Sequence, residues 1–317
     1  MVELSFNSPN KMKGKVIKST GSWYQVLNEN GNIVSCRIKG KFRLEGIKHT
    51  NPVTVGDVVH YEMEPGQENA VINKIEERKN YIIRKSNNLS KQTHIIASNL
   101  DQAILIVTMA FPRTSLGFID RFLLTAEAYH IKPILVFNKQ DLMQSEFKSL
   151  QDYVIQLYEK IGYQCLKTSV NDGTGIAALQ AILKDKTSLL SGHSGVGKSS
   201  LVNAIQPGLH LKTAQISNYS NKGQHTTTFA EMHPLEMGGF IIDTPGIREF
   251  GLVDFDKTEI SHYFKEIQPY IGTCKFNNCI HVNEPGCMVL TAVANGDISE
   301  ERYHSYLSIL NNEDIYE

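Results

Sequence analysis

The order of hydrophobic and polar positions divides this 317-residue chain into three regions. Up to about residue 80, short apolar stretches alternate with turn signals, a pattern that predicts β-strands. The pair Asn30-Gly31 between two of these stretches is typical of a tight hairpin. Five short strands in this length predict a small closed barrel. They are expected at residues 14–18, 23–27, 32–38, 52–61 and 70–75.

From about residue 81 the pattern changes to apolar strands that alternate with amphipathic helices. Nearly continuous apolar strands between helices predict a mainly parallel sheet covered on both faces. The strands are expected at 102–108, 133–137, 163–168 and 187–191, with a strand pair at 229–235 and 239–242. The helices are expected at 115–130, 145–161, 175–183 and 199–205.

The third region, residues 257–317, is smaller and contains a cluster of cysteine and histidine residues. A terminal helix is expected at 299–311. The pattern therefore predicts three domains, at residues 1–80, 81–256 and 257–317.

The composition is that of an ordinary globular protein with a formal net charge of −1. No apolar run is long enough to span a bilayer, and the N-terminal residues lack the features of a signal peptide. We therefore expect a cytoplasmic protein without a membrane partner. In that compartment, the clustering of three of the five cysteines favours a metal site over a disulfide.

The charge is distributed unevenly, because residues 1–95 carry 15 Lys and Arg against 9 Asp and Glu. Such a basic region suggests an anionic partner, although a solvated surface would look the same. An OB-fold, our first expectation for the barrel, often binds nucleic acid. Trp23 and Tyr24 could stack on bases, but a core role is favoured for Trp23. The candidate basic face comprises Lys11, Lys13, Lys15, Lys18, Arg37, Lys39, Lys41 and Arg43.

A glycine-rich stretch between a predicted strand and a predicted helix fits the phosphate-loop pattern G-x-x-x-x-G-K-[ST]. Glycines allow several backbone N–H groups to converge on a phosphate at a helix N-terminus, although a glycine-rich turn could match by chance. Lys198 is expected to reach the β- and γ-phosphates, and Ser199 to ligate Mg²⁺. The expected phosphate-binding residues are Gly192, His193, Ser194, Gly195, Val196, Gly197, Lys198, Ser199 and Ser200.

The base is indicated by Asn138-Lys139-Gln140-Asp141, which follows the strand at 133–137 and fits the N-K-x-D signature of GTP-binding domains. The Asp141 carboxylate can accept two hydrogen bonds from guanine, whereas adenine offers no such donor pair. Asn138 is expected to touch the base and neighbouring loops, with the Lys139 stem along the ring. Ser169 and Val170 follow the next strand, where a backbone N–H would contact the guanine O6. An ordinary polar loop there is the alternative.

Asp243-Thr244-Pro245-Gly246 fits D-x-x-G, in which Asp243 holds Mg²⁺ through water and the Gly246 N–H senses the γ-phosphate. Between this motif and the phosphate loop, Thr227 is the favoured switch I ligand of Mg²⁺, with Thr226 next; a Thr-rich turn before a strand is the alternative. GTPases commonly place a water-orienting Gln after D-x-x-G, but this chain has Ile247. We therefore predict slow intrinsic hydrolysis that a partner accelerates. His225 is the candidate to orient water; a switch residue facing solvent or a partner is the alternative.

These motifs occur in a permuted order, because the base motif precedes the phosphate loop along the chain. Permutation can leave the site intact, since the termini of a compact domain lie at its surface. The barrel and the cysteine region would then anchor the new ends. Switch II would lead directly into the cysteine region, so contacts with the γ-phosphate could move that region.

The cysteine region carries Cys274, Cys279, His281 and Cys287, spaced C-x₄-C-x-H-x₅-C. Three thiolates and one imidazole form a closed tetrahedral set for a structural Zn²⁺, with no position left open for catalysis. Three unligated thiols beside a surface histidine are the alternative.

The permuted N-K-x-D, phosphate loop, H-T-T-T and D-T-P-G motifs, between a small barrel and this cysteine spacing, resemble the bacterial ribosome small subunit-dependent GTPase (RsgA) family. The resemblance covers nearly the whole chain; Thr-Ser-Val replaces the usual Ser-Ala turn. It implies an N-terminal OB-fold barrel, a central circularly permuted P-loop GTPase domain and a C-terminal zinc-binding helical domain. It also implies a monomer that binds GTP with Mg²⁺, contacts the small ribosomal subunit and its 16S rRNA, and hydrolyses GTP in late subunit maturation when that subunit stimulates it.

Two other classes of function are considered. One is an RNA-binding scaffold that holds GTP with little turnover. The other is a P-loop kinase for a small acceptor, against which the paired N-K-Q-D and D-T-P-G motifs argue.

Overall fold

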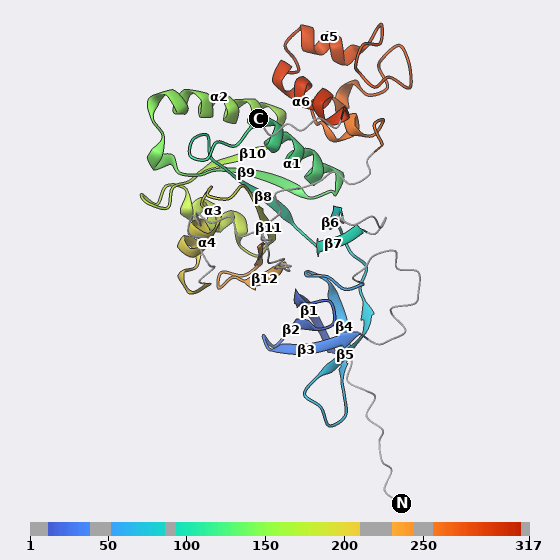
Figure 1. Cartoon of the computed structure of the whole chain (residues 1–317), viewed down its shortest axis with the longest axis vertical. Coiled ribbons are helices and arrows are strands. Elements are labelled where there is room, and N and C mark those ends of the chain that lie inside the picture. The colour runs from blue at the N-terminus through green and yellow to red at the C-terminus, as the bar shows by residue number, and fades with distance from the viewer. Residues whose placement is uncertain (1–11, 39–51, 86–92, 210–229, 244–255, 312–317) are drawn as a thin grey trace, which may run out of the picture.

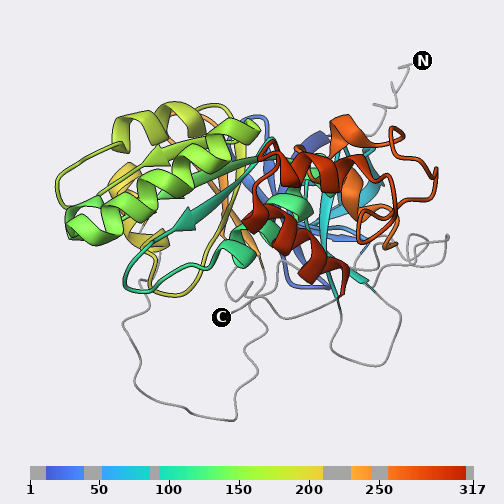
Figure 2. The same ribbon diagram turned by 90° about the horizontal axis from the view of Figure 1, so that it is seen from above.

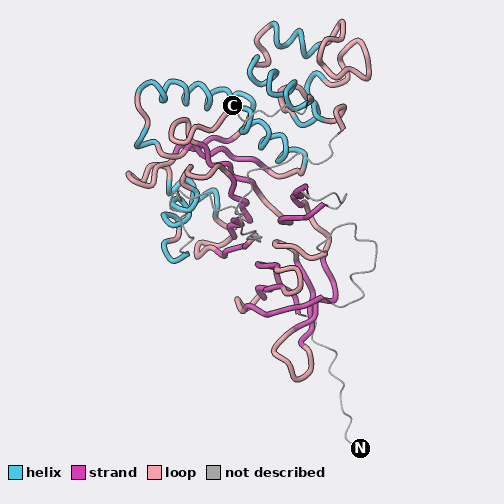
Figure 3. The backbone as a smooth tube through the Cα atoms, in the orientation of Figure 1, coloured by secondary structure: helices cyan, strands magenta, loops and turns pink. Residues whose placement is uncertain are grey.

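The computed structural model describes residues 12–38, 52–85, 93–209, 230–243 and 256–311. A β-barrel near the N-terminus, a central sheet flanked by helices and a small C-terminal region follow one another along the long axis (Figure 1). The strands lie in the first two parts, and the C-terminal region is built from helices and loops (Figure 3). Among these residues, no helix is long and apolar enough to cross a bilayer.

The barrel closes because its first strand pairs with both the second and the fourth strands. The strand order is β1-β2-β3-β5-β4, with β3 and β5 parallel, as expected for an OB-like barrel. The predicted hairpin at Asn30-Gly31 joins β2 and β3, and Gly31 has a φ of 80°, which glycine adopts without strain. The strands are β1 (Met12–Ser19), β2 (Tyr24–Asn28), β3 (Ile33–Ile38), β4 (Val58–Met63) and β5 (Ala70–Ile75).

Two predictions for the barrel are wrong. The strand expected at 52–61 begins only at Val58, because Asp57 turns the preceding chain by accepting a hydrogen bond from the Thr54 N–H at 2.8 Å. The core role favoured for Trp23 is also wrong, since this side chain is 46% exposed. Trp23 lies in the turn before β2, and the inward position belongs to Tyr24, which is 1% exposed.

An unpredicted hairpin joins the barrel to the central sheet; it consists of β6 (Tyr81–Lys85) and β7 (Thr93–Ser98). The fully buried Asp57 carboxylate fixes this joint. It accepts two hydrogen bonds from Arg78, both at 2.7 Å, and one from the Ser98 hydroxyl at 2.6 Å. Separating a buried carboxylate from its partners costs on the order of 3–5 kcal/mol, so the joint resists bending.

The central sheet has the predicted mainly parallel topology, with the order β10-β9-β8-β11-β13-β12. Alternate residues of β8 face opposite sides: Leu105 and Val107 join one core, and Ile104 and Ile106 join the other. Helices α1 and α2 cover the first face and α3 and α4 the second (Figure 2). The strands are β8 (Gln102–Val107), β9 (Lys132–Phe137), β10 (Gln164–Lys167), β11 (Thr187–Ser191), β12 (Glu231–Pro234) and β13 (Phe240–Asp243). The helices are α1 (Leu116–Ala128), α2 (Ser145–Ile161), α3 (Ile176–Leu183) and α4 (Lys198–Ile205).

The barrel and the central sheet are continuous, because β12 pairs antiparallel with both β13 and β1. Lys18 of β1 is opposite Glu231 of β12, and their side chains form an ion pair. The strand that follows the predicted switch I is therefore held by the barrel. The division at residues 80 and 256 remains a proposal.

The C-terminal region packs on α1 through a buried ionic cluster. Arg302 of α6 donates hydrogen bonds to Asp120 of α1 and to Glu266, the latter at 2.5 Å. Burial alone would lower the pKa of Arg302, but Asp120 and Glu266 outweigh it and hold that pKa well above its ordinary value. Short helices η4 (Ile260–Tyr263) and η5 (Gln268–Tyr270) precede α5 (Met288–Ala294), which was not predicted, and α6 (Glu300–Leu310), which was.

Candidate functional site: a nucleotide pocket and a cysteine cluster

The carboxyl ends of five parallel strands meet at one edge of the central sheet. The loops after β8, β9, β10 and β11 carry residues 108–114, 138–141, 168–171 and 192–199, and β13 ends at Asp243. Ligands of open α/β sheets bind outside this edge. Motifs that lie far apart in the sequence are thus collected at one place.

Neighbouring chain segments leave no room for a side chain at two glycines of the phosphate loop. Gly192 and Gly197 have φ values of 142° and 96°. A Cβ on Gly192 would lie 2.5 Å from the Ile106 carbonyl oxygen. A Cβ on Gly197 would lie 2.5 Å from the Asn138 amide nitrogen. Close approach by neighbouring chain segments is therefore one reason for glycine at these two positions.

Asn138 connects the three loops of the pocket and is only 2% exposed. Its Nδ2 donates to the Val196 carbonyl of the phosphate loop at 2.9 Å. Its Oδ1 accepts a hydrogen bond from the Thr168 hydroxyl at 3.0 Å. The expected contact with neighbouring loops is therefore present, and both polar atoms of the buried amide are satisfied.

The Asp141 carboxylate lies at the exposed end of the pocket and is oriented by two side chains. Ser169 donates its hydroxyl to Oδ1 at 2.8 Å, and Asn171 donates its amide to Oδ2 at 2.6 Å. Each carboxylate oxygen has a second lone pair, so both can still accept from a ligand. The Ser169 N–H donates to the Thr174 carbonyl at 2.9 Å. The Val170 N–H is therefore the better candidate for the guanine O6.

Two lysines of the site donate hydrogen bonds to backbone carbonyls of its loops. Lys139, at a φ of 63°, donates its Nζ to the Phe111 carbonyl at 2.7 Å. Lys198 folds back and donates its Nζ to the carbonyls of Gly192 at 2.6 Å and His193 at 2.8 Å. Burial lowers the pKa of Lys198, and the charge of Asp243 opposes that shift. Asp243 stands beside the loop because it pairs in register with Leu190 of β11.

The remaining predicted nucleotide residues divide into two groups. Ser194 and Gly195 are exposed within the loop, Ser200 is exposed in α4, and Ser199 is half-buried in the first turn of α4. Thr227, His225 and Gly246 lie outside the described residues. Asn171 and Phe111, which also contact site residues, were not predicted from the sequence. Asn171 follows Val170 directly, so its position was the available signal, whereas nothing local linked Phe111 to Lys139.

The predicted basic face is only partly described, since Lys11, Lys39, Lys41 and Arg43 lie outside the described residues. The other four face partners within the protein. Lys13 pairs with Glu76 at 2.9 Å, Arg37 pairs with Glu64 at 2.5 Å, and Lys18 pairs with Glu231. The Lys15 Nζ lies 4.4 Å from the centre of the Phe240 ring, and burial lowers its pKa. These four cations do not form an unpaired positive patch.

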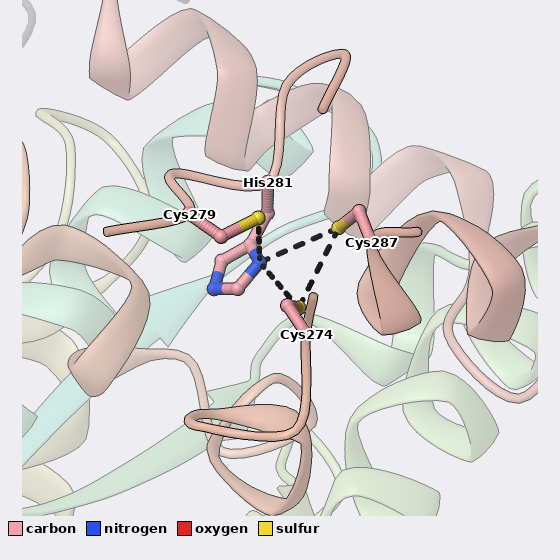
Figure 4. Close-up of side chains that lie close together, drawn as sticks. All are labelled: Cys274, Cys279, His281 and Cys287. Carbon is pink, nitrogen blue, oxygen red and sulfur yellow. Dashed lines mark hydrogen bonds between the residues drawn. The ribbon is translucent and has the colours of Figure 1, made fainter. Parts of the chain in front are cut away.

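The cysteine cluster brings its four predicted ligands together (Figure 4). The His281 Nδ1 lies 3.6, 3.4 and 3.5 Å from the sulfurs of Cys274, Cys279 and Cys287. The sulfurs of Cys274 and Cys287 are 3.9 Å apart. A tetrahedron with metal–sulfur bonds of ~2.3 Å and a metal–nitrogen bond of ~2.0 Å has edges of roughly 3.5 to 3.8 Å. The donor atoms therefore fit one tetrahedral metal ion.

The loop that carries this cluster is held by its own residues and by α6. The Glu284 carboxylate accepts from the N–H groups of Ile280 at 2.7 Å and Val282 at 2.8 Å. Tyr303 donates its hydroxyl to the His281 carbonyl at 2.7 Å. Burial raises the pKa of the Cys279 thiol, so metal binding would release protons and weaken as the pH falls.

Two family models match the chain: the RsgA N-terminal domain over residues 13–72 and the RsgA GTPase over residues 75–253. The "Small ribosomal subunit biogenesis GTPase RsgA" of Bacteroides fragilis is 55% identical over 299 residues, or 94% of this chain and 96% of that protein. The protein of the same name from Flavobacterium psychrophilum is 54% identical over 305 residues, covering 96% and 94% of the two chains.

Two solved structures share the fold. The crystal structure of YjeQ from Thermotoga maritima matches with a TM-score of 0.76 and 36% identity, covering 95% of this chain and 98% of that one. The structure of YloQ, described as a circularly permuted GTPase, matches with a TM-score of 0.73 and 29% identity, covering 98% and 97%.

The sheet order and the sequence of motifs along it define a circularly permuted P-loop GTPase. The barrel and the GTPase part are both matched by models of one family, and relatives above 50% identity span nearly the whole chain. The chain belongs to the RsgA family. It is a GTP hydrolase.

Replacing Gly197 by alanine tests the geometry of the pocket. The added methyl must displace the Asn138 amide, so we expect the dissociation constant for GDP to rise about tenfold or more. Titration with a fluorescent GDP analogue measures it. Gly208→Ala is the matched control, because its Cβ would meet no heavy atom within 4 Å and should leave affinity unchanged. Equal affinities for the wild type and Gly197→Ala would contradict the assignment.

Proposed function

We propose that this chain is a GTPase that binds the small ribosomal subunit and hydrolyses GTP to GDP and phosphate during late maturation of that subunit. The observation that supports this most strongly is the permuted pocket, in which a base-recognition loop and a phosphate loop share the amide of Asn138. Relatives that cover almost the whole chain are named for small ribosomal subunit biogenesis.

In this proposal, Asp141 selects guanine by accepting hydrogen bonds from its N1–H and N2–H₂ groups. The Lys139 stem and Asn138 lie beside the base, and the Val170 N–H contacts its O6, with Ser169 holding the Asp141 carboxylate. The phosphates lie on the N–H groups of residues 192–200 at the start of α4, where the helix dipole favours negative charge.

Lys198 must leave the carbonyls of Gly192 and His193 to reach the phosphates. The flexible four-carbon stem of lysine makes that movement inexpensive, and phosphate offers the Nζ a stronger charge-assisted hydrogen bond than a carbonyl does. Ser199 and Asp243 are the proposed Mg²⁺ ligands in the described residues, with Thr227 completing the set and Gly246 sensing the γ-phosphate. Mg²⁺ would neutralise charge that develops on the phosphates.

We further propose that hydrolysis is slow until the subunit binds. Ile247 stands where a Gln could orient water, so His225 is the candidate for that task. The alternative of a GTP-holding RNA scaffold predicts little turnover under all conditions. A small-acceptor kinase would require transfer of phosphate to a substrate, which the paired guanine and D-x-x-G motifs do not favour.

The proposed partner of the barrel is 16S rRNA. Because the described cations of the basic face are paired within the protein, the exposed Trp23 becomes the stronger candidate for base stacking, a contact worth ~1–3 kcal/mol per base. The other proposed properties are a cytoplasmic location, no membrane partner and a monomeric state.

The cysteine cluster is proposed to hold one structural Zn²⁺. Zinc prefers sulfur and imidazole ligands in tetrahedral geometry, and four protein ligands leave no open position for catalysis. Its contribution would be to fold the loop of residues 274–287 against α6.

The functional proposal is tested by multiple-turnover phosphate release titrated with purified ribosomal subunits. We expect a saturable rise of at least about tenfold with small subunits, because a partner must position water that the chain alone orients poorly. Large subunits are the matched control and should have little effect. Equal rates with both subunits, or no rise with either, would count against the proposal and favour the scaffold.

The metal proposal predicts one zinc per chain in protein purified without chelator, measured by elemental analysis. Cys279→Ser should lower the zinc content and the thermal stability of the C-terminal region, because a structural metal contributes directly to folding. Cys165→Ser is the control, since that cysteine lies outside the cluster and should keep a full complement. Absence of zinc in the wild type, or full zinc in Cys279→Ser, would refute the assignment.

A further inference from the structure

The aromatic ring of Phe118, in helix α1, packs against His193 of the phosphate loop. The ring centres of His193 and Phe118 are 3.8 Å apart, and their planes differ by 33°. Phe118 is 4% exposed and occupies the first turn of α1. Its N–H donates to the hydroxyl of the N-cap residue Ser115 at 3.3 Å, which fixes where the helix begins. The helix therefore fixes the position of the Phe118 ring independently of its contact with the loop.

His193 connects that ring to the phosphate-binding lysine. Its carbonyl accepts a hydrogen bond from the Lys198 Nζ at 2.8 Å, beside the Gly192 carbonyl at 2.6 Å. On its other side, Gly192 is confined by the Ile106 carbonyl, which leaves no space for a Cβ. Because the two rings lie in contact, a displacement of the His193 backbone would break the stack with Phe118. The stack thus limits how far the first residues of the loop can move.

Helix α1 is itself fixed to the C-terminal region. Asp120, in the second turn of α1, is 1% exposed and accepts hydrogen bonds from Arg302 of α6 and from the Tyr158 hydroxyl, the latter at 2.6 Å. Glu266 holds the other side of Arg302. Leu124 of α1 belongs to the hydrophobic core of the C-terminal region. Moving α1 would disrupt a buried ionic cluster, which is strongly unfavourable.

We propose that Phe118 is a positioning residue for the phosphate loop: through His193 it holds the backbone at the start of the loop, and through α1 it connects this segment to the C-terminal region. The inference rests on the proposed role of residues 192–200 in binding phosphates. Packed, described residues would then connect the C-terminal region to the nucleotide without involving switch II.

Phe118→Leu tests this proposal, because it keeps an apolar side chain while removing the ring. The loss of aromatic contact should raise the dissociation constant for GDP about three- to tenfold and lower kcat for GTP. Phe122→Leu is the matched control: it makes the same change one turn along α1, in the same core cluster. It should reduce thermal stability to a similar degree while leaving GDP affinity unchanged. Equal losses of affinity in the two variants would overturn the proposal, since Phe118 would then only fill the core.

His193→Ala provides a second variant at a half-buried position, should Phe118→Leu fold poorly. It should weaken GDP binding by a similar factor, and the double variant should show no additional loss, because both changes remove one contact. Wild-type affinity in His193→Ala, or fully multiplicative losses in the double variant, would also overturn the proposal. Failure of the wild-type chain to bind GDP, or unchanged affinity in Lys198→Ala, would instead contradict the proposed function itself.

Discussion

The hydrogen bond from the Asn138 amide to the Val196 carbonyl joins the two halves of the nucleotide pocket. One half follows β9 and carries Asp141; the other follows β11 and carries Lys198. The bond is buried, and the Thr168 hydroxyl satisfies the other atom of the amide. Losing it would leave a buried polar group without a partner, so the two loops keep a fixed separation. That separation sets the distance at which one ligand can contact both.

Permutation moves the chain ends of the GTPase domain, and the structure shows how each end is secured. At the front, the Asp57 cluster fixes the β6–β7 hairpin, and the pairing of Lys18 with Glu231 continues the sheet into the barrel. At the back, Arg302 fixes the C-terminal region to α1. The flanking regions therefore hold both chain ends of the GTPase part in place. Ordered secondary structure connects each flanking region to the nucleotide pocket.

The motifs were predictable because their chemistry is local: glycine spacing, N-K-x-D and the cysteine spacing each specify a loop geometry. The mainly parallel sheet was predictable because apolar strands between helices have few alternatives, whereas the order of its strands was not predicted. What failed depended on tertiary context. Trp23 and Tyr24 are both aromatic, and only the register of β2 decides which one is buried. Glu76 and Glu64, the partners of Lys13 and Arg37, directly follow β5 and β4 and come close to these cations only in the closed barrel. The Phe118 contact joins segments 75 residues apart, so no local sequence pattern predicts these contacts.

The most direct test of the central claim is a crystal structure of the intact chain with Mg²⁺ and GDP. The account predicts a single GDP that spans the two halves of the pocket, with the guanine N1–H and N2–H₂ on the Asp141 carboxylate and the β-phosphate on residues 192–199. A guanine that makes no contact with Asp141, or a phosphate bound away from this loop, would contradict it.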